Sequence, residues 1–204
     1  MNDRKKEKCF VDSEIYREKF EELLEKNQIM LIMVCNNIVL RIRHIDYLYR
    51  LYMNFLHKYR ADSMHEWSMY SKDFLVAEEI VYHSRKVIDE MIYSLWMHKV
   101  GVSNLDNEKS KCIDSIGKYL SQDVKILTEF DDYWEIIKDI NILSNSYKHS
   151  ICTFSPCETN LSCTEETASF YSYVVRERDF NVKIIQKDLL KTVDKMFEKF
   201  LESI

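Results

Sequence analysis

The chain has 204 residues, of which 46% are hydrophobic, so it can bury one sizeable core. It contains only two glycines and one proline, which disfavours all-β folds and glycine-rich nucleotide-binding folds. The net charge of −5 argues against a surface that binds nucleic acid throughout, but it permits a local basic site. Scarce helix breakers together with abundant leucine, isoleucine, lysine and glutamate predict a mainly helical single domain over residues 1–204.

Three helical segments are expected in the first half of the chain. Apolar residues recur there at helical spacing, and capping residues mark the ends. The patterns place the helices at about 13–27, 29–59 and 71–99. The second of them carries a heptad-like apolar stripe, and Gly101 is expected to end the third.

The second half adds shorter elements. Further helical patterns fall at about 111–120, 128–148 and 187–201. β-branched and aromatic residues at 170–176 and 180–185 flank a polar turn and predict a β-hairpin. Short connections between the long helices favour an antiparallel helical bundle, with 150–185 as a loop and β-hairpin insertion before the C-terminal helix.

The N-terminal residues, the longest apolar run and the cysteines together indicate the cellular compartment of the protein. The basic residues near the N-terminus are not followed by a long apolar region, and the longest apolar run, 29–40, is too short to cross a bilayer. Six cysteines are scattered along the chain, at positions 9, 35, 112, 152, 157 and 163. This spacing favours reduced thiols over a disulfide framework. We therefore expect a soluble cytoplasmic protein that does not contact a membrane.

The region 149–163 is the best place in the sequence for a metal. One histidine and three cysteines fall there: His149, Cys152, Cys157 and Cys163. Structural zinc usually has paired cysteines separated by two to four residues, and only Cys152 and Cys157 approach this spacing. The sequence therefore predicts neither a metal nor a cofactor.

The stretch from Ser144 to His149 carries the strongest functional pattern. Asn145 and His149 are four residues apart, so they share a helix face. An imidazole at a helix end, beside an amide that can fix its tautomer, is a usable general base, and Lys148 adds a cation nearby. Cleavage of RNA without a metal needs a base for the 2′-hydroxyl and a cation for the phosphate. This stretch therefore indicates such chemistry.

Through this stretch the chain resembles HEPN-type domains. These are helical bundles that dimerise and often cleave RNA, through a motif of arginine, a polar residue, three variable residues and histidine. Asn145 and His149 match the polar and histidine positions, whereas Ser144 stands at the arginine position. The chain is also similar to bacterial helical proteins in which an Arg-x-x-x-Asp helix precedes a helix ending in Asn-x-x-Lys-His. Arg85 and Asp89 match the first of these parts, and the resemblance covers about 70–150.

The resemblance implies catalytic roles for five residues. His149 would act as base, and Asn145 would orient its imidazole. Lys148 and Arg85 would stabilise charge, and Arg85, paired with Asp89, could replace the missing motif arginine if it lies within roughly 20 Å of His149. The alternative is purely structural: Asn145 and His149 cap a helix, and Arg85 and Asp89 form an ordinary i, i+4 pair.

A basic and aromatic pattern occupies residues 41–60. Positive residues outnumber negative ones there, although the whole chain is negative. Arg43, Arg50 and His57 recur every seven residues and so line one helix face, and Tyr47 is among the tyrosines interleaved with them at 47, 49, 52 and 59. A basic stripe with aromatic residues is typical of surfaces that bind single-stranded RNA. The alternative is a solvated or dimer-facing polar stripe opposite the core.

Together these patterns predict an HEPN-like helical protein that binds RNA or a protein partner. The resemblance implies membership of a bacterial defence or toxin–antitoxin assembly and pairing as a homodimer or within a complex. If the protein is an enzyme, it is expected to be a metal-independent ribonuclease. The competing hypothesis is a non-enzymatic protein–protein interaction subunit with no RNA role, which docks through the second helix or through 150–185.

Overall fold

The computed structural model describes residues 14–26, 28–61, 72–100, 112–122, 127–149, 169–175 and 178–204. Side chains are described for these residues except at 14–15, 55–61, 72–74, 149 and 185–187 and in the strands other than at Ile184. The described part of the chain is mainly helical, which confirms the fold class expected from the composition.

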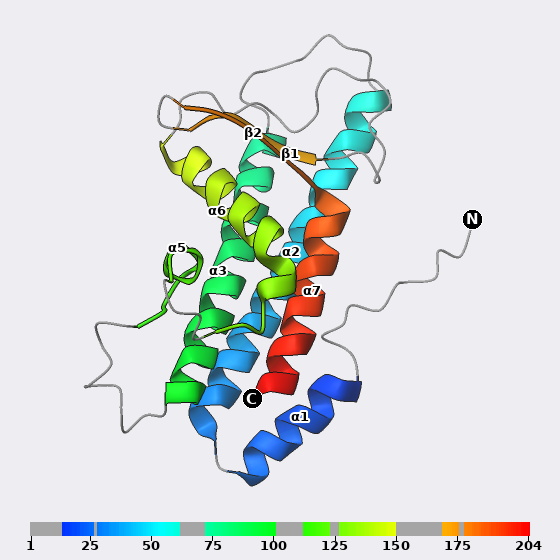
Figure 1. Cartoon of the computed structure of the whole chain (residues 1–204). Helices are drawn as coiled ribbons and strands as arrows, with labels where there is room; N and C mark the ends of the chain where they lie inside the picture. The colour runs from blue at the N-terminus through cyan, green and yellow to red at the C-terminus, as the bar shows by residue number, and fades with distance from the viewer. Residues whose placement is uncertain are drawn as a thin grey trace.

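Long helices dominate the architecture. In chain order they are α1 Glu14–Glu25, α2 Ile29–Ala61, α3 Lys72–Val100, the short α5 Ile116–Leu120, α6 Trp134–His149 and α7 Gln186–Ser203. A 3₁₀ turn, η4 Asp131–Tyr133, leads into α6. Figure 1 shows α2, α3 and α7 side by side, with α6 in front of them and α1 across the lower end. α2 runs antiparallel to α3 and to α7, and α6 runs antiparallel to α3.

The core lies between α2, α3, α6 and α7, where their apolar stripes meet. The residues of α3 that recur at helical spacing along its inward face are all buried: Ala77, Val81, Ser84, Ile88, Met91 and Leu95. The largest fully buried side chains come from several elements: Trp96, Tyr52, Tyr119, Phe130, Phe197 and Phe200. Burial of these aromatic rings supplies a large part of the apolar area removed from water, and it fixes how the helices face one another.

Two strands form an antiparallel pair before the last helix. β1 Ser169–Val175 pairs with β2 Arg178–Ile185, with Ser169 opposite Ile185 and an irregularity between Ser172 and Val174. Ile184 is buried, and β2 continues directly into α7. The pair lies over the upper ends of α6 and α7 in Figure 1.

Two predicted helix boundaries are wrong. The helix expected over 111–120 is confined to α5, because the Asp89 carboxylate accepts the Ile116 backbone N–H at 2.7 Å and residues 112–115 before it are not helical. The helix expected from 128 begins only at Trp134. The backbone N–H of Asp131 donates to the carbonyl of Thr128 at 3.1 Å, so the chain enters α6 through a 3₁₀ turn that follows the buried Phe130.

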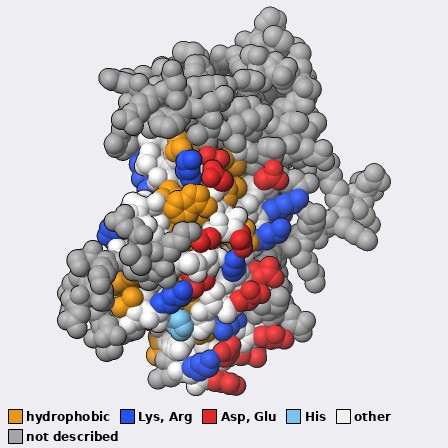
Figure 2. All heavy atoms as spheres, viewed as in Figure 1, with side chains coloured by type: hydrophobic (Ala, Val, Ile, Leu, Met, Phe, Trp, Pro, Cys, Tyr) orange, Lys and Arg blue, Asp and Glu red, His pale blue; other side chains and the backbone are white. Residues whose placement is uncertain are grey.

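Charges of both signs alternate on the face that Figure 2 shows. Along α7, acidic and basic residues follow one another closely, and Lys199 Nζ lies 2.8 Å from Asp132 Oδ2 ahead of α6. On this face, the residues that are coloured form no basic patch large enough to bind nucleic acid through charge alone.

Candidate functional site

A polar cluster joins the middle of α3 to the last turns of α6. Arg85 Nη1 donates to Ser144 Oγ at 2.6 Å and to Asn145 Oδ1 at 2.9 Å. The Arg85 side chain is only 16% exposed, so its charge is partly removed from water. α3 buries one face against the core, and Arg85 lies at the edge of that face, from where its long side chain reaches α6. The structure thus brings together Arg85 and Asn145, as the resemblance implies.

Asp89 lies one helical turn beyond Arg85 and extends the cluster to α5. Its Oδ2 is 3.7 Å from Arg85 Nε, and its Oδ1 accepts the Ile116 backbone N–H at 2.7 Å. Burial raises the pKa of Asp89, while the Ile116 hydrogen bond and the positive charge of Arg85 oppose that rise. Asp89 therefore holds both the guanidinium of Arg85 and the first turn of α5.

On α6, the amide of Asn145 has partners on both sides. Its Oδ1 accepts from Arg85, and its Nδ2 donates to Asn141 Oδ1 at 3.3 Å. Ser144, which is 3% exposed, also donates to the Asn141 carbonyl at 3.1 Å. The structure therefore directs the Asn145 amide to Arg85 and Asn141, whereas the resemblance assigns it to the imidazole of His149.

His149 is the last residue of α6, and its side chain lies outside the described residues. Four residues separate it from Asn145, which corresponds to about 6 Å along the helix axis. Since Arg85 contacts Asn145 directly, the backbone of His149 satisfies the limit of roughly 20 Å set by the replacement hypothesis.

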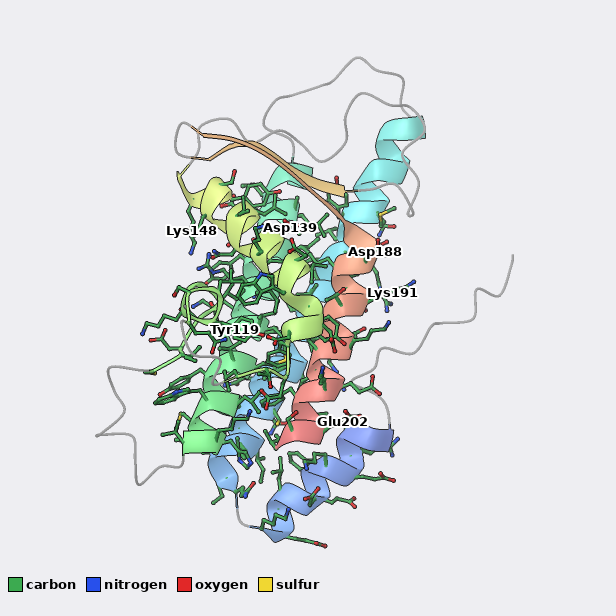
Figure 3. The ribbon with its side chains drawn as sticks, in the orientation of Figure 1. Tyr119, Asp139, Lys148, Asp188, Lys191 and Glu202 are labelled. Carbon is green, nitrogen blue, oxygen red and sulfur yellow. The ribbon has the colours of Figure 1, made fainter. Side chains whose placement is uncertain are left out.

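An open groove of about 320 Å³ lies beside the cluster, between the first half of α3 and the end of α6. It is lined by four residues of α3 and three of α6: Leu75, Glu78, Glu79, Tyr82, Ser144, Tyr147 and Lys148. Lys148 is exposed and projects outward from the upper end of α6 (Figure 3). Burial and the neighbouring charge of Glu78 raise the pKa of Tyr147. The groove therefore has two carboxylates on its α3 side and one cation, Lys148, on its α6 side.

The predicted RNA-binding residues of α2 form a separate surface. Arg43, Arg50 and Tyr47 are exposed, whereas the side chain of His57 lies outside the described residues. Arg50 Nη2 lies 2.7 Å from Asp46 Oδ2, so a neighbouring carboxylate compensates part of its charge. The expectation that tyrosines interleave along this face is wrong at Tyr52, which is fully buried because its position points to the core.

A cluster between α2 and α3 was not expected from the sequence. Arg41 Nε lies 2.9 Å from Glu90 Oε1, and Arg41 Nη1 lies 3.4 Å from His83 Nδ1. The rings of His83 and His44 meet edge to face at 4.8 Å. Burial lowers the pKa of His83, and the charges of His44 and Arg41 lower it further. These four residues share no local sequence motif, so only the packing of α2 against α3 reveals the cluster.

Neither a metal site, nor a membrane-spanning helix, nor a related protein helps to assign a function to the described residues. Within the part of the chain that the structure describes, no three His, Cys, Asp or Glu side chains gather as a metal site would need; Cys152, Cys157 and Cys163 lie outside it. None of the helices described there has the length and apolar character needed to span a membrane. Compared with protein-family models, curated proteins and solved structures, the chain has no match.

Proposed function

We propose that the protein is an HEPN-like helical bundle that binds RNA at the end of α6, beside the groove it shares with α3. One observation carries the proposal. Arg85 donates to both Ser144 and Asn145, so a cation from α3 lies beside the position at which the HEPN motif would have its arginine. Ser144, which stands at the arginine position of that motif, accepts a hydrogen bond from Arg85. The biological setting follows the resemblance: a bacterial defence or toxin–antitoxin assembly.

The charge distribution of the groove restricts where a phosphate can lie. Glu78 and Glu79 on α3 repel it, whereas Lys148 on α6 attracts it. Arg85 adds a second, more buried positive charge next to Asn145. A backbone phosphate therefore binds on the α6 side of the groove, where charge-assisted hydrogen bonds are strongest.

Cleavage, in this proposal, needs only residues at the end of α6 and the middle of α3. His149 takes the proton of the 2′-hydroxyl, the 2′-oxygen attacks the phosphorus, and the 5′-oxygen leaves and takes a proton from water, while Lys148 and Arg85 stabilise the charge that develops on the phosphate. Asn145 positions Arg85, because it accepts a hydrogen bond from the guanidinium at 2.9 Å. The reaction uses no metal, since general base and cations are all supplied by side chains.

Binding is tested by fluorescence anisotropy with labelled single-stranded RNA. Lys148→Ala removes one exposed charge from the groove, so we expect weaker binding and a salt dependence whose slope decreases by about 1. Lys138→Ala is the matched control, because Lys138 is an exposed lysine of the same helix whose side chain is 53% exposed and which lies outside the groove. Equal effects of the two substitutions, or no RNA binding by the wild type, would contradict the proposal.

Cleavage is tested separately with His149→Ala. We expect loss of RNA cleavage with an almost unchanged melting temperature, because His149 ends the helix. If the melting temperature falls sharply instead, His149 has the structural role of capping or tying down the chain. If the wild type binds RNA but does not cleave it, the catalytic part of the proposal fails while the binding part remains.

A second function is favoured by a different observation. Large apolar side chains are exposed along α2, which suits a non-enzymatic protein–protein interaction subunit. Substitutions on α2 that abolish a protein interaction without changing RNA binding would support this function, whereas RNA binding that depends on Lys148 supports the first.

A further inference from the structure

Exposed apolar side chains gather on one helix. Among the described residues, nine large hydrophobic side chains are exposed, and five of them lie on α2. These five are Ile29, Met30, Met33, Leu40 and Tyr47, which are between 58% and 62% exposed. Single exposed apolar residues are ordinary on protein surfaces, but a group confined to nineteen residues of one helix marks a contact surface.

Their spacing is regular. Four of them, together with two polar residues, follow one another at intervals of three and four residues: Met30, Met33, Asn37, Leu40, His44 and Tyr47, called here the α2 stripe. This is the a/d spacing of a helix that packs against another helix. The opposite face of α2 already packs into the core through Cys35, Ile38, Ile42 and Ile45. A helix that is apolar on two faces is normally buried on both.

We propose that the α2 stripe is the interface between two copies of this chain, which pair with their α2 helices antiparallel. The intervals of the stripe are 3, 4, 3, 4 and 3, and they are the same when read from either end. A two-fold interface requires that residue i meets residue j and that j meets i. An antiparallel pair centred between Asn37 and Leu40 satisfies this requirement at every position of the stripe.

This register places sulfur against aromatic rings. Met30 lies opposite Tyr47 of the partner copy, and Met33 lies opposite His44 of the partner copy. Contacts between a thioether and an aromatic ring are favourable, and the unbranched methionine adapts to the ring surface. Asn37 lies opposite Leu40 of the partner copy, near the two-fold axis, where an amide at the edge of a helix pair restricts the register.

The area is sufficient for a dimer. At about three fifths of roughly 200 Å² apiece, the four apolar side chains of the stripe expose on the order of 500 Å² of apolar surface per copy, near the upper end for a protein that remains a monomer. Two such surfaces bury about 1,000 Å² together, which reaches the lower limit for a specific interface. The stripe contains no lysine or arginine, so it offers nothing to a phosphate backbone or an anionic lipid surface. This inference does not depend on the RNA function proposed above.

Self-association is measured by analytical ultracentrifugation of the full chain over a wide concentration range. We expect a monomer–dimer equilibrium that Leu40→Glu and Met33→Glu each weaken by at least about 30-fold, since each buries a charge at the interface. Leu75→Glu is the matched control. Leu75 is 59% exposed, close to the 62% of Leu40, but it lies on α3 beside the groove. Circular dichroism spectra and melting curves of the three variants establish that each remains folded.

Disulfide cross-linking tests the antiparallel register. In this register, positions 30 and 47 of different copies are neighbours, while the two copies of position 30 are about 25 Å apart along the helix axes. The double variant Met30→Cys with Tyr47→Cys should therefore form covalent dimers under mild oxidation, and Met30→Cys alone should not exceed the wild type. The wild type measures the background from the six native cysteines.

Several results overturn the proposal. A chain that is monomeric at every concentration, or a dimer that Leu75→Glu weakens as much as Leu40→Glu does, excludes the α2 stripe as the interface. Cross-linking by Met30→Cys alone excludes the antiparallel register. Binding of the monomer to anionic vesicles that Leu40→Glu abolishes would replace the second copy with a lipid surface as the occupant.

Discussion

Two regions of this molecule depart in opposite directions from the usual rule of apolar inside and polar outside. Between α3 and α6, an arginine, a serine and an asparagine meet in a largely buried contact, with Asp89 beside them. On the outer face of α2, methionine, leucine and tyrosine side chains are about three fifths exposed. The first region buries polar groups, and the second exposes apolar ones.

The difference lies in where each region finds its partners. In the α3–α6 contact, Arg85 reaches Ser144 and Asn145, and Asp89 reaches Ile116, so the desolvated groups are compensated within one chain. The α2 stripe has no such compensation in the described fold, because its side chains remain exposed. The polar contact is thus complete within one copy, whereas the apolar stripe needs a second molecule.

The largest effect is expected where the internal compensation is broken. Arg85→Met removes the guanidinium and leaves Ser144, Asn145 and the Asp89 carboxylate buried without it. We expect the free energy of unfolding to fall by about 2–4 kcal/mol, since buried polar groups lose their partner. In thermal denaturation this corresponds to a decrease in Tm on the order of 10 °C.

A matched variant separates this effect from loss of charge alone. Lys86→Met removes the neighbouring positive charge on α3, and we expect a change within about 0.5 kcal/mol because the hydrogen bonds to Ser144 and Asn145 come from Arg85 and not from the half-buried Lys86. Adding Asp89→Asn to Arg85→Met should recover part of the loss, because the carboxylate no longer lies buried beside an empty site. Equal losses for Arg85→Met and Lys86→Met would show that the contact contributes little.

The fold was largely predictable because its helices have clear periodicity. The inward positions of α3, from Ala77 to Leu95, follow from their spacing alone and are all buried. The ends of the helices were predictable only where residues close in the sequence determine them. The start of α5 depends on Asp89, which is 27 residues away in the chain, so no local pattern could place it.

The candidate site was predictable in part. Arg85 and Asn145 were singled out on separate helices through the resemblance, and the structure joins them by a hydrogen bond. Ser144 was visible only as a departure from a motif, because its role as acceptor depends on how α3 packs against α6. The α2 stripe was not predicted: the heptad-like spacing of the sequence belongs to the core-facing residues of this helix, such as Ile38, Ile42 and Tyr52, and the exposure of Met33 and Leu40 on the other face is known only from the fold.

An intermediate effect is expected at a second, partly buried carboxylate. Partial burial, with a smaller contribution from the negative charge of Asp46, raises the pKa of Asp194 on α7 from 3.8 to about 6. Among the described residues no cation forms an ion pair with Asp194, whereas Asp89 has Arg85 and the Ile116 N–H. Asp194 is thus a partly buried polar group that lacks the compensation seen in the α3–α6 contact.

The pH dependence of Asp194 has a definite sign. Because the folded pKa is raised, the native state holds the proton more tightly than the unfolded chain, so stability falls as pH rises from about 4 to about 6. Asp194→Asn should therefore raise Tm by about 2–4 °C at neutral pH and by almost nothing near pH 4. Asp188→Asn replaces an exposed aspartate in the first turn of the same helix, where the carboxylate interacts favourably with the helix dipole, so it should not raise Tm at either pH. An equal gain for Asp194→Asn at both pH values would rule out titration as the cause.

The smallest effect on the isolated chain is expected in the α2 stripe. Leu40→Ala should change the stability of the monomer by less than about 0.5 kcal/mol, because Leu40 is 62% exposed and packs little within its own chain. Leu95→Ala, at a fully buried leucine of α3, should lower the free energy of unfolding by about 2–5 kcal/mol and is the matched comparison.

The dependence of Tm on protein concentration then distinguishes a structural role of Leu40 from a role at an interface. A wild-type Tm that rises with concentration, and a Leu40→Ala Tm that rises less, follow from coupling between folding and pairing. A loss at Leu40 that is large and independent of concentration would place this side chain in the core, and the two regions would no longer differ.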